Sequence, residues 1–409
     1  MRRIVVKFGG TSVGDGRMVR SAANSVYREY KRGAQVAVVV SAMGFTTDEL
    51  ISAAKTSTGG RIGENEMDDI MAMGERTSAR IFAAALRSLG ANARYIDPTS
   101  QEWPIVTDSN FGNARINLTE TRRRVRRFIL PLLAKGTIPV ICGFLGKDEQ
   151  GKITTLGRGG SDITAFLLGS CLGADEVIIV KDVDGVMGGD PSKVRGTNLL
   201  EHITVEEMRD LARYGAQVLH PRAMNYKDPE IDAKVIHFRH GSLSARGTTI
   251  VGPMGDVMGV RLYDKPLAML TIIGKQMQLV PGVLVKAATP LSRAGINIFG
   301  VSIGPRSFSL YVDRAKATRA LRLLHDVVKM NKSMKSVTSE NDIAMMIAES
   351  EKFIETPGIV EKLTEPLGKE KINIIEIFSS RASITFFINW SDSKRALKLL
   401  KKTMEEVCV

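Results

Sequence analysis

Short apolar runs alternate with longer amphipathic segments along the first ~250 residues. The runs have the length and β-branched composition of buried strands: IVVKF at 4–8, VAVVVS at 36–41, IPVIC at 138–142 and VIIV at 177–180. Helical patterns lie between them, for example at 69–90 and 115–134. Strands that alternate with helices predict an α/β fold, and we expect a three-layer αβα domain with a mostly parallel sheet over residues 1–252.

The rest of the sequence repeats itself with a constant spacing of 76 residues. Pro281-Gly282 recurs as Pro357-Gly358, and Ile296-Asn297-Ile298 recurs as Ile372-Asn373-Ile374. One unbroken spacing over several matches indicates two copies of a single module. Each copy predicts the order βαββαβ. We place the copies at 268–338 and 339–409, after a linker at 253–267.

Two glycines directly follow the first predicted strand, in the segment Lys7-Phe8-Gly9-Gly10-Thr11-Ser12. Glycines let backbone N–H groups approach phosphate oxygens, and a lysine at the strand end can place a positive charge on a transferring phosphate. Ligands of such folds bind at the carboxyl ends of the strands. The Gly-Lys-Ser/Thr order of a P-loop is missing, so the pattern indicates a different phosphate site, with a simple tight turn as the alternative.

Two later loops combine charged residues with glycine. In TTLGRGGSD at 154–162, Arg158 can clamp a carboxylate with two parallel hydrogen bonds, and Asp162 lies near the start of a predicted helix, where negative charge is stabilised. After the VIIV strand, the segment 181–186 (KDVDGV) is a polar loop that suits a nucleotide or a metal–phosphate complex. An ordinary helix cap and an Asp-Gly turn are the alternative interpretations.

Composition and charge narrow the class of protein. With 409 residues, 44% of them hydrophobic and 25% charged, the chain has ordinary globular composition and room for two or three domains. Its three cysteines lack metal-ligand spacing, and no apolar run reaches the ~20 residues that span a bilayer, so we expect a cytoplasmic protein without a membrane partner. The net charge of +13 comes without an aromatic-interleaved basic motif, and we expect no nucleic-acid partner.

Together the motifs resemble those of the amino-acid kinase superfamily and, within it, the aspartate kinases. The motifs that carry the resemblance are KFGGTSV at 7–13, VVSAM at 39–43, GE at 74–75, FGNARI at 111–116, TTLGRGGSD at 154–162, DVDGV at 182–186 and YGAQVLHP at 214–221. The doubled tail looks like a pair of ACT domains, which usually bind an amino acid.

The resemblance implies phosphorylation of the β-carboxylate of L-aspartate with ATP and Mg²⁺, the first step toward lysine, threonine and methionine. It also implies feedback inhibition by an allosteric amino acid, lysine or threonine, and a homodimer or higher homo-oligomer formed through the ACT domains. Because the attacking carboxylate, with a reference pKa of ~3.9, is already ionised near neutral pH, no general base is needed.

Roles for single residues follow from the same resemblance. Lys7 and Asp162 would be the catalytic pair. Arg158 would bind the α-carboxylate of aspartate, and Glu75 would bind its ammonium group. The remaining implied positions are Ser41 and Thr47 for substrate, Gly9, Gly10, Ser12, Lys181, Asp182, Asp190 and Lys193 for nucleotide, and Asn297, Ser302 and Asn373 for regulation. No protein metal site is implied.

The nucleotide loop departs from the family pattern Thr-Asp-Val-x-Gly-Val-Tyr-Thr-Thr-Asp-Pro-Arg. This chain has Lys181, Met187 and Ser192 at the first, the Tyr and the Arg positions. One alternative is a relative that phosphorylates glutamate, acetylglutamate or UMP, against which the combined KFGGTSV and RGGSD motifs and the doubled tail argue. Another is an amino-acid sensor without catalysis, which only the altered loop favours.

Overall fold

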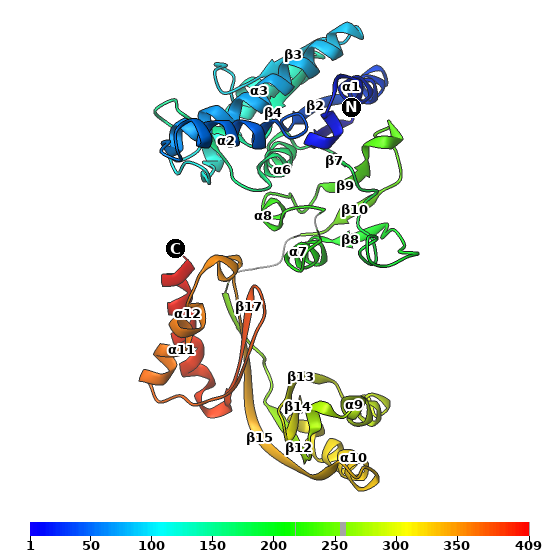
Figure 1. The fold of residues 1–409 in the computed structure, drawn as a ribbon, viewed down its shortest axis with the longest axis vertical. Helices are drawn as coiled ribbons and strands as arrows, with labels where there is room; N and C mark the ends of the chain where they lie inside the picture. Colours follow the sequence, from blue (N-terminus) through cyan, green and yellow to red (C-terminus); the bar gives the residue numbers. More distant parts are fainter. Residues whose placement is uncertain (217, 254–258, 409) are drawn as a thin grey trace. The chain divides into compact units, whose positions relative to one another are not determined.

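The computed structural model describes residues 1–216, 218–253 and 259–408, and the contacts between residues divide the chain into two compact units at 1–255 and 256–409. Figure 1 shows the ribbon of each unit. Every helix among the described residues is too short or too polar to cross a bilayer. Residues 254–258 of the predicted linker lie outside the described residues.

An eight-stranded sheet forms the centre of the first unit. Its order is β3 (Ala93–Ile96), β4 (Ile138–Cys142), β2 (Gln35–Val40), β1 (Arg3–Phe8), β7 (Glu176–Lys181), β9 (Asp232–His237), β10 (Thr248–Val251) and β8 (His202–Thr204). Every neighbouring pair is parallel except β9 with β10. The central strands are buried apolar runs, as expected of a parallel sheet that is covered on both faces.

Helices cover both faces of this sheet. Against one face pack α1 (Gly16–Lys31) and α3 (Glu64–Ser88), and α2 (Thr46–Ser57) packs on α3. The other face carries α6 (Gly160–Leu172), the segment α4 (Leu118–Arg124), η2 (Val125–Ile129) and α5 (Leu130–Ala134), and the short helices α7 (Val205–Arg213) and α8 (Pro221–Met224). The predicted three-layer αβα domain is thereby confirmed. A small antiparallel hairpin of β5 (Leu145–Lys147) and β6 (Ile153–Thr155) leads into α6.

The second unit contains the two predicted modules in one antiparallel sheet. Its strands are β11 (Gly259–Leu262), β12 (Leu267–Gly274), β13 (Ile298–Ile303), β14 (Ser307–Asp313), β15 (Met334–Glu349), β16 (Ile374–Ser379) and β17 (Ser383–Asn389). The helices are α9 (Val283–Arg293) and α10 (Ala317–Met330) in the first module and α11 (Ile359–Lys369) and α12 (Ser393–Cys408) in the second.

One long strand serves both modules. The first part of β15 pairs with β12, and the part from Ile343 onward pairs with β17. On the other edge of that later part lies β11, with Leu262 opposite Met346. The second module therefore takes a strand from the segment that precedes the first module, inside the stretch that we expected to be a linker. Sequence spacing missed this strand because β11 is only four residues long.

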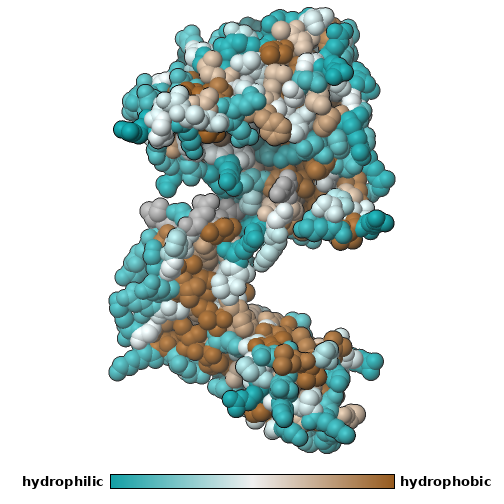
Figure 2. All heavy atoms as spheres, in the orientation of Figure 1, coloured by the Kyte–Doolittle hydropathy of each residue, from teal (hydrophilic) through white to brown (hydrophobic). Residues whose placement is uncertain are grey.

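Apolar side chains join the modules to each other. Tyr311 of β14 and Phe387 of β17 stack with ring centroids 3.9 Å apart, in a cluster separate from the two helix-covered cores. The Tyr311 hydroxyl donates a hydrogen bond to Glu376 of β16 over 2.7 Å. Figure 2 shows that apolar side chains also gather on the visible surface of this unit. Exposed large apolar residues include Ile273, Leu279, Val285, Ile303 and Met330.

Candidate active site

An ion pair between Lys7 and Asp162 lies at the carboxyl end of β1. Lys7 is the fifth residue of β1, and Asp162 is in the first turn of α6. The Lys7 Nζ and Asp162 Oδ1 atoms are 2.7 Å apart, and both side chains are buried. Burial raises the pKa of Asp162, but the charges of Lys7 and Lys181 outweigh this and hold the pKa below its usual value. Asp162 is therefore an anion that fixes a lysine at the sheet edge.

Lys181 is a second lysine on the same carboxylate. It ends β7, the strand beside β1, and its Nζ donates to Asp162 Oδ2 over 3.1 Å and to the Val218 carbonyl. Two cations around one carboxylate leave a local excess of positive charge, and Lys7 and Lys181 are both positioned by protein contacts. This arrangement suits a ligand that carries several negative charges.

The predicted substrate residues line one cleft of about 520 Å³ beside this ion pair. Arg158 lies in the loop before α6 and has no hydrogen bond or ion pair recorded within the described residues. The other predicted residues on the lining are Lys7, Gly10, Ser41, Thr47, Glu75 and Asp162. Residues that are far apart in the sequence thus line one cleft, which has both positively and negatively charged side chains on its surface.

Glu75 supplies the negative wall. It lies on the buried face of α3, and its Oε1 accepts a hydrogen bond from the Ala42 N–H over 3.2 Å. Its Oε2 is buried and has no hydrogen-bond partner recorded in the described protein. Burial raises the pKa of Glu75 to about 7, against the opposing influence of the Ala42 hydrogen bond and of Lys7. An ammonium group in the cleft would satisfy the free oxygen and its charge.

Glycines permit the close approaches that shape the cleft. A Cβ at Gly74 would come within 2.8 Å of the Ala42 Cβ, so glycine lets α3 lie against the loop after β2 and brings Glu75 to Ala42. Gly159 has φ of +76° and faces His220 so closely that a side chain would collide with it. Both positions thus need glycine for packing, and the second also for its backbone conformation.

The phosphate-loop residues do not all face the cleft. Gly10 lines it, whereas the N–H of Gly9 and the hydroxyl of Ser12 both donate to the Val180 carbonyl over 3.1 Å. Ser12 lines a separate cavity of about 260 Å³ on the α1 side. In this structure the Ser12 hydroxyl joins the segment after β1 to β7, and the contact of Ser12 with phosphate stays a prediction.

The remaining predicted nucleotide residues lie on the loop after β7. Asp182 is exposed and close enough to Lys7 to affect its pKa. Asp190 and Lys193 pair with each other over 3.1 Å and are largely exposed. Neither belongs to the lining of the cleft as described. An oxygen of Asp190 also accepts hydrogen bonds from Ser192, so in this structure its visible role is to shape the loop.

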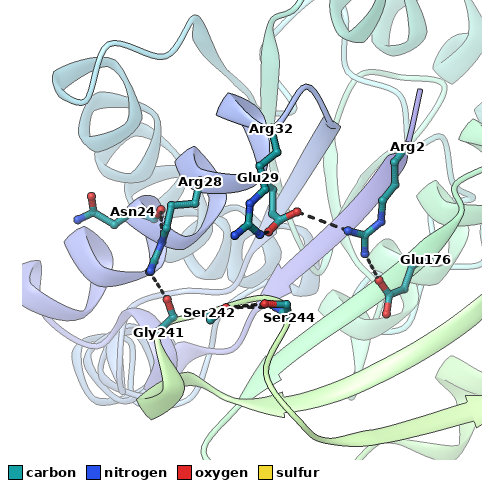
Figure 3. Close-up of polar contacts among 9 residues, drawn as sticks. All are labelled: Arg2, Asn24, Arg28, Glu29, Arg32, Glu176, Gly241, Ser242 and Ser244. Carbon is teal, nitrogen blue, oxygen red and sulfur yellow. Dashed lines mark hydrogen bonds and ion pairs between the residues drawn. The ribbon is translucent and has the colours of Figure 1, made fainter.

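Contacts on the α1 face hold β1 in place (Figure 3). Arg2, just before β1, donates to Glu176 of β7 over 2.6 Å and to Glu29 of α1 over 3.4 Å. Arg28 of α1 donates to the carbonyl of Gly241, in the loop before β10. These contacts fix α1 and the amino end of β1 against β7, and so constrain where Lys7 lies at the other end.

Two further carboxylates were given no role of their own from the sequence, although Asp184 belongs to the predicted nucleotide loop. Asp184 bonds Arg239 and, over 3.1 Å, His240, which joins the loop after β7 to the helix η3 (Phe238–His240). Asp68 of α3 is buried and bonds residues on the cleft wall. Asp68 lies seven residues before Glu75, a spacing of about two helical turns that puts both on one face, and this was the available signal. The expected helix began at residue 69 and left it out.

The proposed regulatory positions occupy matching places in the two modules. Asn297 is exposed just before β13, and Asn373 is exposed just before β16. Ser302 lies within β13, opposite Ser309 of β14. Because β13 and β16 are the two end strands of the sheet, these residues lie beside its open edges.

Family models match almost the whole chain. Residues 2–237 match the amino acid kinase family, and residues 263–326 and 338–402 match an ACT domain. These matches show an ATP-dependent kinase, and the chain belongs to the amino acid kinase family.

Within that family the chain is one of the aspartokinases with tandem ACT domains. The aspartokinase of Bacillus sp. strain MGA3 is 34% identical over 417 aligned positions, which cover 99% of this chain and 98% of the relative. The aspartate kinase of Synechocystis superposes with a TM-score of 0.81 at 26% identity, over 98% of this chain and 69% of that one. Escherichia coli aspartokinase III, solved with aspartate and ADP, shares the fold at 23% identity with a TM-score of 0.55, over 98% of this chain and 99% of that one.

Proposed function

We propose that the protein phosphorylates the β-carboxylate of L-aspartate with ATP to give 4-phospho-L-aspartate, the first step of the route to lysine, threonine and methionine. The observation that carries the proposal is the cleft. Beside the Lys7–Asp162 pair it holds Arg158, which has no partner among the described residues, and a buried Glu75 with one oxygen hydrogen-bonded. The aspartokinase relatives, and the aspartate and ADP bound to the Escherichia coli protein, support it.

Each charge of aspartate has an opposite charge in the cleft. The guanidinium of Arg158 can bind the α-carboxylate through two parallel hydrogen bonds. The free Oε2 of Glu75 accepts from the ammonium group. Ser41 and Thr47 add hydroxyls to the same lining. The β-carboxylate then points toward Lys7 and the phosphates. Its ionised oxygen would attack the γ-phosphorus of ATP without a general base, while the bond from that phosphorus to the bridging oxygen breaks and ADP leaves.

Catalysis would rest on position and charge. Lys7, held by Asp162, would stabilise the negative charge of the phosphoryl group during transfer. Lys181 would add a second positive charge from the neighbouring strand. This charge would compensate for the Arg of the family's nucleotide loop, which is Ser192 in this chain. The nucleotide phosphates would lie between Gly10 and these lysines at the carboxyl ends of β1 and β7.

One exposed carboxylate near the lysines, Asp182, fits a magnesium ion that is carried mainly by the phosphates of ATP. No group of three or more His, Cys, Asp or Glu side chains that could hold a metal occurs among the described residues. Magnesium commonly uses one or two carboxylates together with substrate phosphates. Both oxygens of Asp162 are paired with Lys7 and Lys181, so the exposed Asp182 would be the carboxylate that is available to the ion. When bound, the ion neutralises phosphate charge.

The ACT modules would bind a feedback inhibitor, lysine or threonine, and join copies of the chain in a homodimer or larger homo-oligomer. Support comes from the open edges at β13 and β16, where Asn297 and Asn373 lie, because open strand edges are ready sites of pairing between chains. Escherichia coli aspartokinase III has been solved with lysine and aspartate. Thermal-shift titration with lysine, threonine and methionine would identify the ligand, since a ligand of the folded state raises the melting temperature.

The direct test is formation of the hydroxamate from ATP, Mg²⁺, hydroxylamine and aspartate. We expect aspartate-dependent hydroxamate and ADP, and almost none with Asp162→Asn as the matched control. Activity with glutamate, acetylglutamate or UMP in place of aspartate would assign the protein to another kinase of the family. No binding of Mg-ATP at millimolar concentration would instead favour a sensor.

A further inference from the structure

A buried carboxylate on α3 is bonded to two separate segments of the cleft wall. Asp68 is 1% exposed. Its oxygens accept from the Gly112 N–H over 2.9 and 3.1 Å, from the Thr155 N–H over 2.8 Å and from the Thr155 hydroxyl over 2.9 Å. No lysine or arginine pairs with Asp68 in the described structure, so backbone and hydroxyl donors satisfy the carboxylate.

The partners of Asp68 belong to the cleft and not to the apolar core. Gly112 and Thr155 both line the space that holds Arg158 and Glu75. Thr155 ends β6 and is three residues before Arg158, and its carbonyl accepts from the Ala114 N–H over 2.9 Å. The Asp68 carboxylate thus binds both the loop around Gly112 and the strand that leads to Arg158.

Asp68 is on α3, the same helix that carries Glu75. At ~1.5 Å rise per residue, seven residues separate the two carboxylates by ~10 Å along one face of α3. Glu75 is bonded to Ala42 on the β2 side of the cleft, and Asp68 is bonded to the β6 side. The helix therefore sets the distance between the residue that receives the ammonium group and the loop that carries the carboxylate clamp.

We propose that Asp68 is a positioning residue for the amino-acid substrate, which acts by holding the Gly112 and Thr155 segments so that Arg158 faces Glu75 at the span of an α-amino acid. The proposal rests on the proposed function, because it takes aspartate as the ligand of that span. Asp68 does not contact the substrate. Its loss affects the amino-acid side of the cleft and leaves the Lys7–Lys181 side in place.

Asp68→Asn tests the proposal, because the variant keeps the size of the side chain but turns an amide NH₂ toward groups that are themselves donors. We expect KM for aspartate to rise about 10- to 100-fold, because a displaced Arg158 loses charge-assisted hydrogen bonds to the α-carboxylate, with KM for ATP unchanged within about twofold. The control is Asp69→Asn, one residue along the same helix, whose side chain is exposed and should leave both constants unchanged.

Thr155→Val gives a milder version that removes only the hydroxyl donor, and we expect a smaller rise in KM for aspartate alone. It carries the test if Asp68→Asn does not fold. Equal changes in KM for both substrates, or a normal KM for aspartate in a folded Asp68→Asn protein, would overturn the proposal.

Amide hydrogen exchange gives a readout that does not depend on activity. In Asp68→Asn the amides of Gly112 and Thr155 should exchange faster, while those of β1 and β7 keep the wild-type rate. Unchanged exchange at Gly112 and Thr155 would overturn the positioning role. If the wild-type protein shows no aspartate-dependent hydroxamate, aspartate as substrate fails, and faster exchange would still support Asp68 as the residue that holds this wall.

Discussion

Replacing Glu75 by glutamine should change how stability depends on pH. In the folded protein this carboxyl is 3% exposed, and burial raises its pKa to about 7, whereas the ordinary value is 4.5. In the unfolded chain the carboxyl is hydrated and has the ordinary value. The folded state then holds the proton more tightly, so the free energy of unfolding falls as pH rises from 4.5 to about 7.

The size of the effect follows from the two pKa values. A tenfold difference in proton affinity is worth ~1.4 kcal/mol, so the step from 4.5 to about 7 makes ionised Glu75 cost ~3 kcal/mol. Glutamine cannot ionise, and it can keep the hydrogen bond from Ala42. Any fixed cost of the amide is the same at every pH, so it cancels when the gap between variant and wild type is compared at two pH values.

Urea unfolding at pH 4.5 and pH 8 is the assay, in a Trp390→Phe background so that fluorescence reports the fully buried Trp103 of the first unit. We expect the free energy of unfolding of Glu75→Gln, relative to wild type, to be ~3 kcal/mol higher at pH 8 than at pH 4.5. Glu64→Gln, at an exposed position on the same helix, is the control for loss of a carboxylate that is not buried. A constant gap for Glu75→Gln would refute the reasoning.

The same pKa predicts the pH dependence of substrate binding. An ammonium group is attracted by the ionised form, so KM for aspartate should fall as pH rises through about 7. Aspartate binding should then release a proton near neutral pH, which calorimetry in buffers of different ionisation enthalpy would detect. A KM for aspartate that is flat between pH 6 and 8 would argue against Glu75 as the ammonium partner.

Three further results are expected. Arg158→Lys should raise KM for aspartate about tenfold without a change in KM for ATP, because lysine cannot bind a carboxylate in the bidentate geometry of arginine. Steady-state kinetics with each substrate varied will show whether the effect is confined to aspartate. Lys181→Thr should raise KM for ATP several-fold and leave KM for aspartate unchanged, so a normal KM for ATP would remove Lys181 from the nucleotide site. Ile303→Lys, at a position 49% exposed on end strand β13, should weaken self-association in sedimentation velocity, and an unaltered sedimentation coefficient would exclude pairing at this edge.

The hydrophobic patterns and the internal repeat of the chain were sufficient to predict its main strands and its two C-terminal modules. Apolar runs at 4–8, 36–41, 138–142 and 177–180 became β1, β2, β4 and β7, because a strand buried on both faces is recognisable without knowledge of its neighbours. The 76-residue repeat likewise located two modules with matching helices and strands. The strand β11 was not predicted, because a strand of four residues is too short to show a recognisable hydrophobic pattern.

Local sequence also indicated which side chains carry charge at strand ends, but not which of them meet. Lys7 and Asp162 are adjacent because β1 lies beside β7 and α6 packs on both, and this order of strands is a property of the whole sheet. Ser12 makes a contact that the local sequence did not indicate. The resemblance predicts that Ser12 contacts phosphate, whereas in this structure its hydroxyl donates to the Val180 carbonyl of the neighbouring strand.

The sequence by itself determined the class of fold and the doubled module, because each depends on a local pattern of apolar, glycine and charged positions. The resemblance of its motifs to those of the aspartate kinases indicated several of the residues that line the cleft. Only the tertiary structure decided that Asp162 contacts two lysines, that Asp68 joins both segments of the cleft wall, and that β11 completes the second module. Those contacts join residues that are tens to hundreds of positions apart, and burial strengthens the interactions between their charges.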